Sequence, residues 1–380
     1  MRPGSRWDIF CTVIDNYGDI GITWRLARQL VAEHRLSVRL WVDDLESFRH
    51  IRPEIDPSLD RQTCQGVEIR HWCSPLPEVE PADVVIEALA CHLPEQYEQA
   101  MAEQAVKPLW LNLEYLSAED WVAGCHGLPS PHPRLPLTKY FFMPGYVVGT
   151  GGVLKESWLV RERDAFQIDV QARNEFWLAL GIPVEQVGEL RISLFSYESQ
   201  AIESLFQSWV EGSQPVRCLV PEGKSLLNVA RFFGRTALAP GDVLARGALA
   251  VHVLPMLDQD RYDRLLWACD CNLVRGEDSL VRAIWAGRPL VWQAYRQAEG
   301  AHWPKINALL DLYCRGVAEA GTLRRLWQAW NEDGDAGPVW TPFWAHRERW
   351  LARSAAWQAG LDEVGDLAGN LVKFCNEKSK

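Results

Sequence analysis

Two carboxylates, Asp15 and Asp19, share the stretch Asp15-Asn-Tyr-Gly-Asp-Ile-Gly21, whose glycines permit a tight turn. The stretch separates a predicted strand from a predicted helix. Both acids are therefore expected at the carboxyl end of the strand, the edge where open α/β sheets bind ligands. A structural alternative is that Asp19 caps a helix starting near Gly21 while Asp15 closes a turn. Two acids in one loop favour the functional interpretation.

A second candidate site is Arg275-Gly-Glu-Asp-Ser279, which again lies between a predicted strand and a predicted helix. A helix N-terminus offers free N–H groups and partial positive charge to an anion. The charge of Arg275 and the hydroxyl of Ser279 could hold a diphosphate, while Glu277 could accept hydrogen bonds from ribose hydroxyls. Asp278 or Ser279 is also expected as the helix N-cap, a role compatible with binding.

Standard nucleotide and hydrolase motifs are incomplete. Glu222-Gly-Lys-Ser225 resembles the end of a P-loop, but Cys218 stands where the first glycine is needed. Gly149-Thr-Gly-Gly152 starts like a dinucleotide fingerprint, but Leu154 replaces its last glycine. The G-x-S-x-G and H-E-x-x-H motifs are absent, and the histidines are scattered. Neither triad hydrolase nor zincin chemistry is indicated.

The elements that must position these residues follow from the apolar pattern, which alternates short buried runs with helical periodicity. Ile22, Leu26 and Leu30 recur at helical spacing behind the first loop. The predicted strands are Ile9–Ile14, Leu36–Val42, Val84–Leu89, Pro108–Leu113, Tyr140–Met143, Leu190–Phe195, Val216–Val220, Leu249–Leu254, Asn272–Val274 and Pro289–Trp292. This order predicts an α/β fold with parallel sheets wound by crossovers in both halves.

The strand rhythm stops between Gly151 and Gln186, where the chain becomes polar and charged. We place the domain boundary there. The predicted organisation is an N-terminal domain, a linker, a C-terminal domain and a Trp-rich helical segment, at residues 1–158, 159–186, 187–340 and 341–380.

Composition limits the classes of partner. The chain has 380 residues, with 39 Lys+Arg against 50 Asp+Glu and a formal net charge of −11. A chain of this length can form two domains that need no disulfide bond or metal ion for stability. The surplus of acidic residues argues against general binding to nucleic acid or to an anionic membrane. With no apolar run fit for a membrane span or a signal peptide, we expect a cytoplasmic protein with its ten cysteines reduced.

Taken together, the two loops resemble the EarP family, bacterial protein-arginine rhamnosyltransferases that modify translation elongation factor P. The similarity covers most of the chain and includes Trp24-Arg-Leu-Ala27, Asn112-Leu-Glu-Tyr-Leu116, His126-Gly-Leu-Pro-Ser-Pro131, Lys139-Tyr-Phe-Phe142, Pro144-Gly145 and Gly151-Gly152. The resemblance implies a GT-B fold: two Rossmann-like domains facing a central cleft, with the C-terminal helix crossing back to the N-terminal domain.

The resemblance further implies that the C-terminal domain holds the donor TDP-β-L-rhamnose, with no metal or other cofactor. The implied donor residues are Tyr17, Gly18, Phe195, Tyr197, Met256, Gln259, Tyr262, Arg275, Glu277, Asp278 and Ser279. Arg275, Asp278 and Ser279 would serve the diphosphate and Glu277 the nucleoside sugar. Four of the others, Phe195, Tyr197, Gln259 and Tyr262, would surround the thymine. Phe195 and Tyr262 could instead be core aromatics.

The implied acceptor is an arginine of elongation factor P, which the modification would activate for rescue of polyproline-stalled ribosomes. A guanidinium is a poor nucleophile because its lone pairs are delocalised and its pKa exceeds about 12. We expect Asp19 to take the proton and Asp15 to orient the guanidinium, with Asn16 and Glu114 on the acceptor side. Attack opposite TDP would invert the anomeric centre.

Three alternatives stay open at the level of sequence. One is a GT-B transferase with a different acceptor, and the second is a nucleotide-sugar-binding protein without catalytic activity. The third is an oxidoreductase with a Rossmann domain, which would have to bind nicotinamide.

Overall fold

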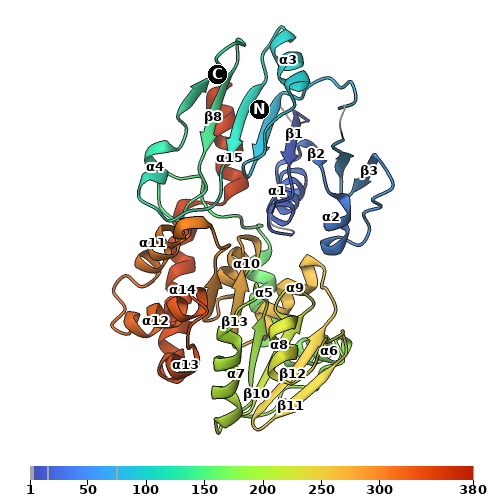
Figure 1. Ribbon diagram of the computed structural model, residues 1–380. Helices are drawn as coiled ribbons and strands as arrows, with labels where there is room; N and C mark the ends of the chain where they lie inside the picture. Colours follow the sequence, from blue (N-terminus) through green and yellow to red (C-terminus); the bar gives the residue numbers. More distant parts are fainter. Residues whose placement is uncertain (1–3, 15–16, 74–75, 380) are drawn as a thin grey trace. The chain divides into compact units, whose positions relative to one another are not determined.

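The computed structural model describes residues 4–14, 17–73 and 76–379, and the chain forms two compact units (Figure 1). Unit 1 comprises Met1–Ser157 and Gly360–Lys380, and unit 2 comprises Trp158–Ala359. Both ends of the chain therefore belong to unit 1, and unit 2 is inserted between its two segments. The segment 159–186, expected as a linker, is part of unit 2, and the chain re-enters unit 1 at Gly360 instead of residue 341.

Unit 1 is built on an eight-stranded sheet in the order β3-β4-β2-β1-β5-β6-β8-β7. Its strands are β1 (Arg6–Cys11), β2 (Ser37–Val42), β3 (Arg61–Cys64), β4 (Val67–His71), β5 (Val84–Ala88), β6 (Leu109–Leu113), β7 (Pro129–Pro131) and β8 (Thr138–Phe142). The inner pairs are parallel, and only the edge pairs β3/β4 and β7/β8 are antiparallel. The helices are α1 (Gly18–His34), α2 (Leu45–Ile51), α3 (Glu95–Glu103), α4 (Trp121–Cys125) and α15 (Leu367–Lys378).

Strand β1 lies in the middle of this sheet, where it pairs with β2 on one side and β5 on the other. Every residue of β1 after Arg6 is buried, as expected of a strand covered on both faces. The strand runs from Arg6 to Cys11, whereas the apolar run predicted Ile9–Ile14. Residues 12–14 therefore belong to the loop that leads into α1.

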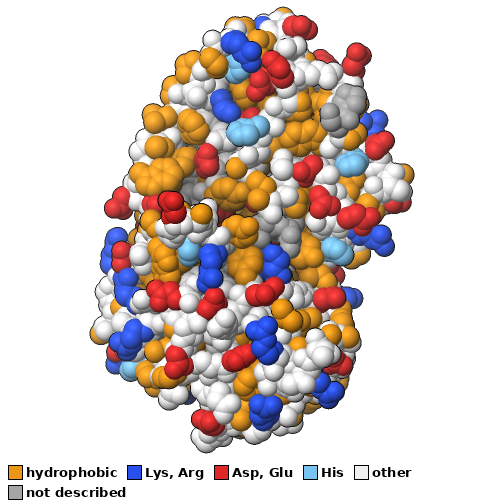
Figure 2. Space-filling model, in the orientation of Figure 1, with side chains coloured by type: hydrophobic (Ala, Val, Ile, Leu, Met, Phe, Trp, Pro, Cys, Tyr) orange, Lys and Arg blue, Asp and Glu red, His pale blue; other side chains and the backbone are white. Residues whose placement is uncertain are grey.

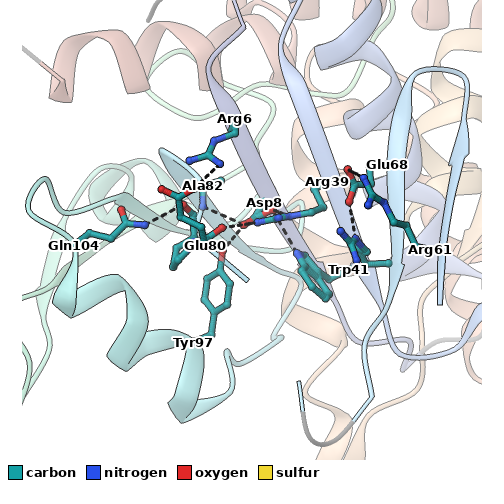
Figure 3. A network of polar contacts seen from close by, with 12 residues as sticks. Arg6, Asp8, Arg39, Trp41, Arg61, Glu68, Glu80, Ala82, Tyr97 and Gln104 are labelled. Carbon is teal, nitrogen blue, oxygen red and sulfur yellow. Dashed lines mark hydrogen bonds and ion pairs between the residues drawn. The ribbon is translucent and has the colours of Figure 1, made fainter. Parts of the chain in front are cut away.

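A buried carboxylate, Asp8, holds the centre of the unit 1 sheet together. Arg39 of β2 donates two hydrogen bonds to it, at 2.5 and 2.6 Å. Ala82 N and Trp41 Nε1 donate at 3.2 and 3.4 Å, and Tyr97 of α3 donates its hydroxyl proton (Figure 3). Burial, with the charge of Asp8 next, raises the pKa of Tyr97 well above its ordinary value. Asp8 is fully buried, so its charge depends on these partners.

Unit 1 is completed by its second segment. Helix α15 packs against α1, and Gln29 Nε2 of α1 donates to Asp366 Oδ1 at the α15 N-cap over 3.1 Å. Asn370 Nδ2 donates to Gly151 O at 3.2 Å, and Val153 and Asp366 form a parallel β-bridge. The last part of unit 1 is therefore fixed to the loops that follow β8.

Unit 2 contains a six-stranded sheet in the order β11-β12-β10-β9-β13-β14, parallel except for the edge pair β11/β12. Its strands are β9 (Leu190–Leu194), β10 (Val216–Pro221), β11 (Val243–Arg246), β12 (Leu249–Leu254), β13 (Cys271–Arg275) and β14 (Leu290–Gln293). Its helices are α5 (Leu159–Ile168), α6 (Val170–Ala179), α7 (Ala201–Glu211), α8 (Leu226–Phe232), α9 (Gln259–Ala268), α10 (Asp278–Ala286), the short η1 (Ala298–Gly300), α11 (Trp303–Tyr313), α12 (Ala320–Asn331) and α13 (Gly337–Trp344). Helix α14 (Arg347–Val364) carries the chain from unit 2 into unit 1.

The surface carries both signs of charge. On the face shown in Figure 2, acidic and basic side chains are interspersed. No helix among the described residues combines the length and the apolar character that a membrane crossing requires.

Removing the Asp8 carboxylate should strongly destabilise the protein, because it leaves the Arg39 guanidinium without its ion-pair partner. We expect Asp8→Ala to lower the free energy of unfolding of unit 1 by about 3–5 kcal/mol, measured by urea denaturation. The exposed pair Arg6–Glu80 provides a control, and Glu80→Ala should cost less than about 1 kcal/mol. Equal urea midpoints for Asp8→Ala and the unaltered protein would contradict a stabilising role.

Candidate active site

The strand order of unit 1 reverses next to β1. The chain leaves β1 for β2 on one side and later returns to β5 on the other. The connections that follow β1 and β5 consequently diverge, and such a reversal point is where open α/β sheets bind ligands. The connection after β1 leads into α1, whose first turn carries the predicted acid Asp19.

Asp19 lies in the first turn of α1 with its side chain buried. The helix begins at Gly18 with Tyr17 as N-cap, so the alternative that Asp19 caps a helix from Gly21 is wrong. Its carboxylate accepts from Ile14 N (2.9 Å to Oδ2) and from the Tyr115 hydroxyl (3.2 Å to Oδ1). Asp19 thus binds its own loop and a second loop of the sheet edge. Asp15 and Asn16 lie outside the described residues.

The Cys11 thiol, at the end of β1, lies near Asp19. Burial raises the pKa of the Cys11 thiol well above its ordinary value, and the nearby Asp19 carboxylate adds to the shift. On the other side of the loop, the half-buried Tyr17 ring packs edge-on against His50, with 5.7 Å between ring centroids. Gly18 starts α1 directly behind it.

The loop after β6 supplies Glu114 and Tyr115 to the same edge. Glu114 Oε1 accepts from Asn112 Nδ2 at 2.5 Å, and its backbone N–H donates to Phe142 O at 3.0 Å. Glu114, predicted on the acceptor side, therefore neighbours the residue that reaches Asp19. Tyr115 itself was not selected from the sequence. Its position directly after a parallel strand was the available signal, because such strands end at one edge.

Leu89 and Ala90, which follow β5, both have left-handed backbone conformations, with φ of 57° and 63°. Such conformations cost a non-glycine residue roughly 1–2 kcal/mol and persist only where the surrounding structure holds them. The Leu89 carbonyl oxygen lies 3.1 Å from the Tyr115 hydroxyl. Strained backbone therefore lies at the reversal point of the sheet, beside the candidate acid.

Unit 2 has its own reversal point, between β9 and β13. The guanidinium carbon of Arg275, at the end of β13, lies 4.7 Å from the ring centroid of Phe195 and 4.6 Å from that of Tyr197. The Tyr262 ring packs edge-on against Phe195 at 5.6 Å between centroids. Arg275 is buried, so its charge is held among aromatic faces. Four predicted donor residues thus form one cluster.

The start of α10 lies beside this cluster. Glu277 is the N-cap and Asp278 the first helical residue; neither Asp278 nor Ser279 is the N-cap, contrary to expectation. Ser279 Oγ accepts from Arg275 N at 3.2 Å and donates to Arg275 O, so it ties the helix start to β13. Gln259 Nε2 donates to Asp278 Oδ2 at 3.3 Å.

Other groups of unit 2 join the cluster without having been predicted. Lys305 of α11 forms an ion pair with Glu277, and Gln293 Oε1 accepts from Tyr197 N at 2.9 Å. The P-loop-like stretch follows β10, and a Cβ at Gly223 would lie 3.2 Å from the Phe195 ring. Met256, predicted at the donor, is half-buried in the connection between β12 and α9.

These arrangements differ in the chemistry they support. The buried carboxylate of unit 1 can accept a proton or bind a cation, whereas the arginine, helix N-terminus and aromatic rings of unit 2 suit an anion joined to a flat base. Among the residues the structure describes, no three His, Cys, Asp or Glu side chains gather in a way that could hold a metal ion.

Comparisons with known proteins agree with this geometry. A family model described as "Elongation-Factor P (EF-P) rhamnosyltransferase EarP" matches residues 7–376. Proteins named protein-arginine rhamnosyltransferase from Pseudomonas putida and Pseudomonas aeruginosa are each 50% identical, over 97% of this chain and 98% of theirs. A solved structure described as the structural basis for EarP-mediated arginine glycosylation of translation elongation factor EF-P aligns with a TM-score of 0.71 and 34% identity, over 98% of this chain and 99% of that one. The fold is GT-B.

Ser279→Ala removes the hydroxyl that joins α10 to β13. We expect the free energy of unfolding to fall by about 0.5–1.5 kcal/mol, because a buried hydrogen-bonding group is lost from the strand end. Urea denaturation measures the change. Ser213→Ala, at an exposed position of unit 2, should stay within about 0.5 kcal/mol of the unaltered protein. Equal losses in the two variants would contradict the role of Ser279.

Proposed function

Because this chain belongs to the EarP family of protein-arginine rhamnosyltransferases, we propose that it transfers rhamnose from TDP-β-L-rhamnose to an arginine of translation elongation factor P, with inversion at the anomeric carbon. The observation that carries the proposal is that each unit has its own site at the reversal point of its sheet, and that the two sites differ in chemistry. Unit 1 offers a buried carboxylate, and unit 2 offers a cation, a helix N-terminus and aromatic rings.

Unit 1 is the proposed acceptor side. The guanidinium of the acceptor must lose a proton as its nitrogen attacks, and Asp19 is the proposed base because its carboxylate is anchored by Ile14 N and Tyr115. Asp15, Asn16 and Glu114 are proposed to orient the guanidinium through charge-assisted and amide hydrogen bonds. Anchoring matters because a base that is already in place gives up less entropy on reaching the transition state.

Unit 2 is the proposed donor side. Arg275, Asp278, Ser279 and the N-terminus of α10 would hold the diphosphate, and Glu277 would bind the nucleoside sugar. The thymine would lie among Phe195, Tyr197, Met256, Gln259 and Tyr262, with Tyr17 and Gly18 of unit 1 also proposed at the donor. Lys305, paired with Glu277, brings a second cation to this side.

The proposed reaction is a single displacement. The guanidinium nitrogen forms a bond to the anomeric carbon while the bond from that carbon to the diphosphate oxygen breaks, and its electron pair leaves with TDP. The proton from the nitrogen passes to Asp19. Arg275 and the α10 N–H groups stabilise the charge that develops on the leaving diphosphate, so the proposed step needs no metal ion.

The defining experiment is to incubate the protein with TDP-rhamnose and elongation factor P and to search by mass spectrometry for one deoxyhexose on an arginine. Transfer to that arginine supports the proposal. Donor binding without transfer would instead indicate a nucleotide-sugar-binding protein, and transfer only to another acceptor would overturn the assignment of elongation factor P.

Asp19→Asn should abolish transfer, because the amide keeps the size of the side chain but cannot take the proton. We expect the transfer rate to fall by a factor of about 10² or more, while TDP-rhamnose affinity stays unchanged. Rates are measured by mass spectrometry and affinity by calorimetry. Asp362→Asn, which alters an acid of unit 1 paired with Lys155, is the control and should retain the unaltered rate. Near-normal turnover of Asp19→Asn would remove this residue from the chemistry.

Glu277→Ala should weaken TDP binding, because it removes the carboxylate proposed to bind the nucleoside sugar. A lost hydrogen bond to a charged group corresponds to an affinity about 10- to 100-fold lower, measured calorimetrically. Arg275→Ala should act in the same direction through the diphosphate. The control Glu203→Ala, at an exposed position on α7, should bind TDP normally. Unchanged affinity in both site variants would place the donor elsewhere.

A further inference from the structure

The Tyr115 hydroxyl lies between two acceptors that belong to different loops of unit 1. One is Asp19 Oδ1 at 3.2 Å, and the other is the Leu89 carbonyl oxygen at 3.1 Å. A phenol has a single proton, so Tyr115 can donate to only one of them at a time. Its oxygen can at the same time accept a hydrogen bond. The three groups therefore form a short chain in which the direction of hydrogen bonding can reverse.

The Leu89 acceptor is held rigidly. The residue is buried, its N–H donates to Leu113 O of β6 at 2.8 Å, and both it and Ala90 keep left-handed backbone conformations. Such conformations persist only where neighbouring structure enforces them. The carbonyl is thus fixed within reach of the hydroxyl, and a rotation of the O–H bond alone transfers the hydrogen bond from one acceptor to the other.

We propose that Tyr115 is a positioning residue whose hydroxyl follows the protonation state of Asp19. While Asp19 is a carboxylate, the Tyr115 hydroxyl donates to Oδ1. When Oδ1 of Asp19 is protonated, the hydroxyl donates to Leu89 O instead. The proposal rests on the proposed function, in which Asp19 takes the acceptor proton. The N–H bond of the guanidinium breaks, the O–H bond of Asp19 forms, and the new acid donates to the Tyr115 oxygen. No further reactant is required.

The other titratable groups near Asp19 limit what a pH profile can report. Among the described residues, Cys11 on β1 interacts electrostatically with Asp19, and Cys91 after β5 and Asp43 after β2 interact in the same way with Cys11. Burial raises the pKa of both thiols, that of Cys91 to about 12, so they stay neutral at working pH. Asp43 Oδ1 accepts from Val13 N at 2.9 Å. Asp43→Asn keeps the oxygen that accepts from Val13 N but removes the titrating carboxyl group. Any part of the pH–rate profile that remains in this variant does not come from Asp43.

The test is the transfer rate of Tyr115→Phe as a function of pH. Tyr115→Phe removes the hydroxyl that donates to the Asp19 carboxylate and so favours its charged form. Its loss should therefore lower kcat about 10- to 100-fold and move the acid limb of the pH–rate profile to higher pH. TDP affinity should not change. Tyr140→Phe, which alters a tyrosine of β8 whose ring lies under Lys378, is the matched control and should keep the unaltered profile. The shift should persist in Asp43→Asn.

A second variant keeps the hydroxyl of residue 115. Placing 3-fluorotyrosine at position 115 makes the phenol a stronger donor, so the acid limb should move to lower pH, opposite to Tyr115→Phe. If the unaltered protein transfers rhamnose and neither variant moves the acid limb, Tyr115 has no such role. If the unaltered protein transfers nothing, the proposed function has failed instead.

Discussion

Parallel pairing on both sides of a central strand is the constraint on which both candidate sites depend. In unit 1, β1 pairs with β2 and β5, and in unit 2, β9 pairs with β10 and β13. The chain leaves the sheet in opposite directions at these points, and ligands of open α/β sheets bind at the carboxyl edge there. The same reversal of strand order therefore positions a candidate base in unit 1 and a candidate anion-binding site in unit 2.

The inner strands could be predicted because a strand covered on both faces is a continuous apolar run. The predicted run Leu249–Leu254 coincides with β12. The antiparallel edge strands β3, β7 and β11 were not predicted because they are short and none of their residues is buried. Strand β3, for example, is Arg-Gln-Thr-Cys. The segment that forms α5 and α6 has the sequence pattern of a linker because exposed charged residues cover much of the surface of these helices. Their apolar contacts, such as Phe166 against Trp267, come from packing within unit 2.

The candidate residues could be predicted where the acid or cation directly follows a predicted strand, as with Asp19 and Arg275. Their local roles could not. Helices α1 and α10 both begin earlier than the capping preferences suggested. The side chains of Asp19 and Ser279 form hydrogen bonds with residues outside their own helices. Tyr115 and Lys305 belong to segments distant in sequence from Asp19 and Glu277, and their contacts depend on sheet register and helix packing. No local pattern encodes such contacts, and the buried charge of Asp8 was missed for the same reason.

The insertion of unit 2 within unit 1 affects the order in which the protein can fold during synthesis. Domains usually fold as they emerge, the N-terminal one first. Unit 2 is continuous, so all of its strands are available once its last helix leaves the ribosome. Unit 1 begins earlier but is finished later, since α15 must arrive to cover α1. The nascent chain therefore carries an unfinished N-terminal half, with the part of α1 that α15 covers still exposed, until translation has passed residue 378.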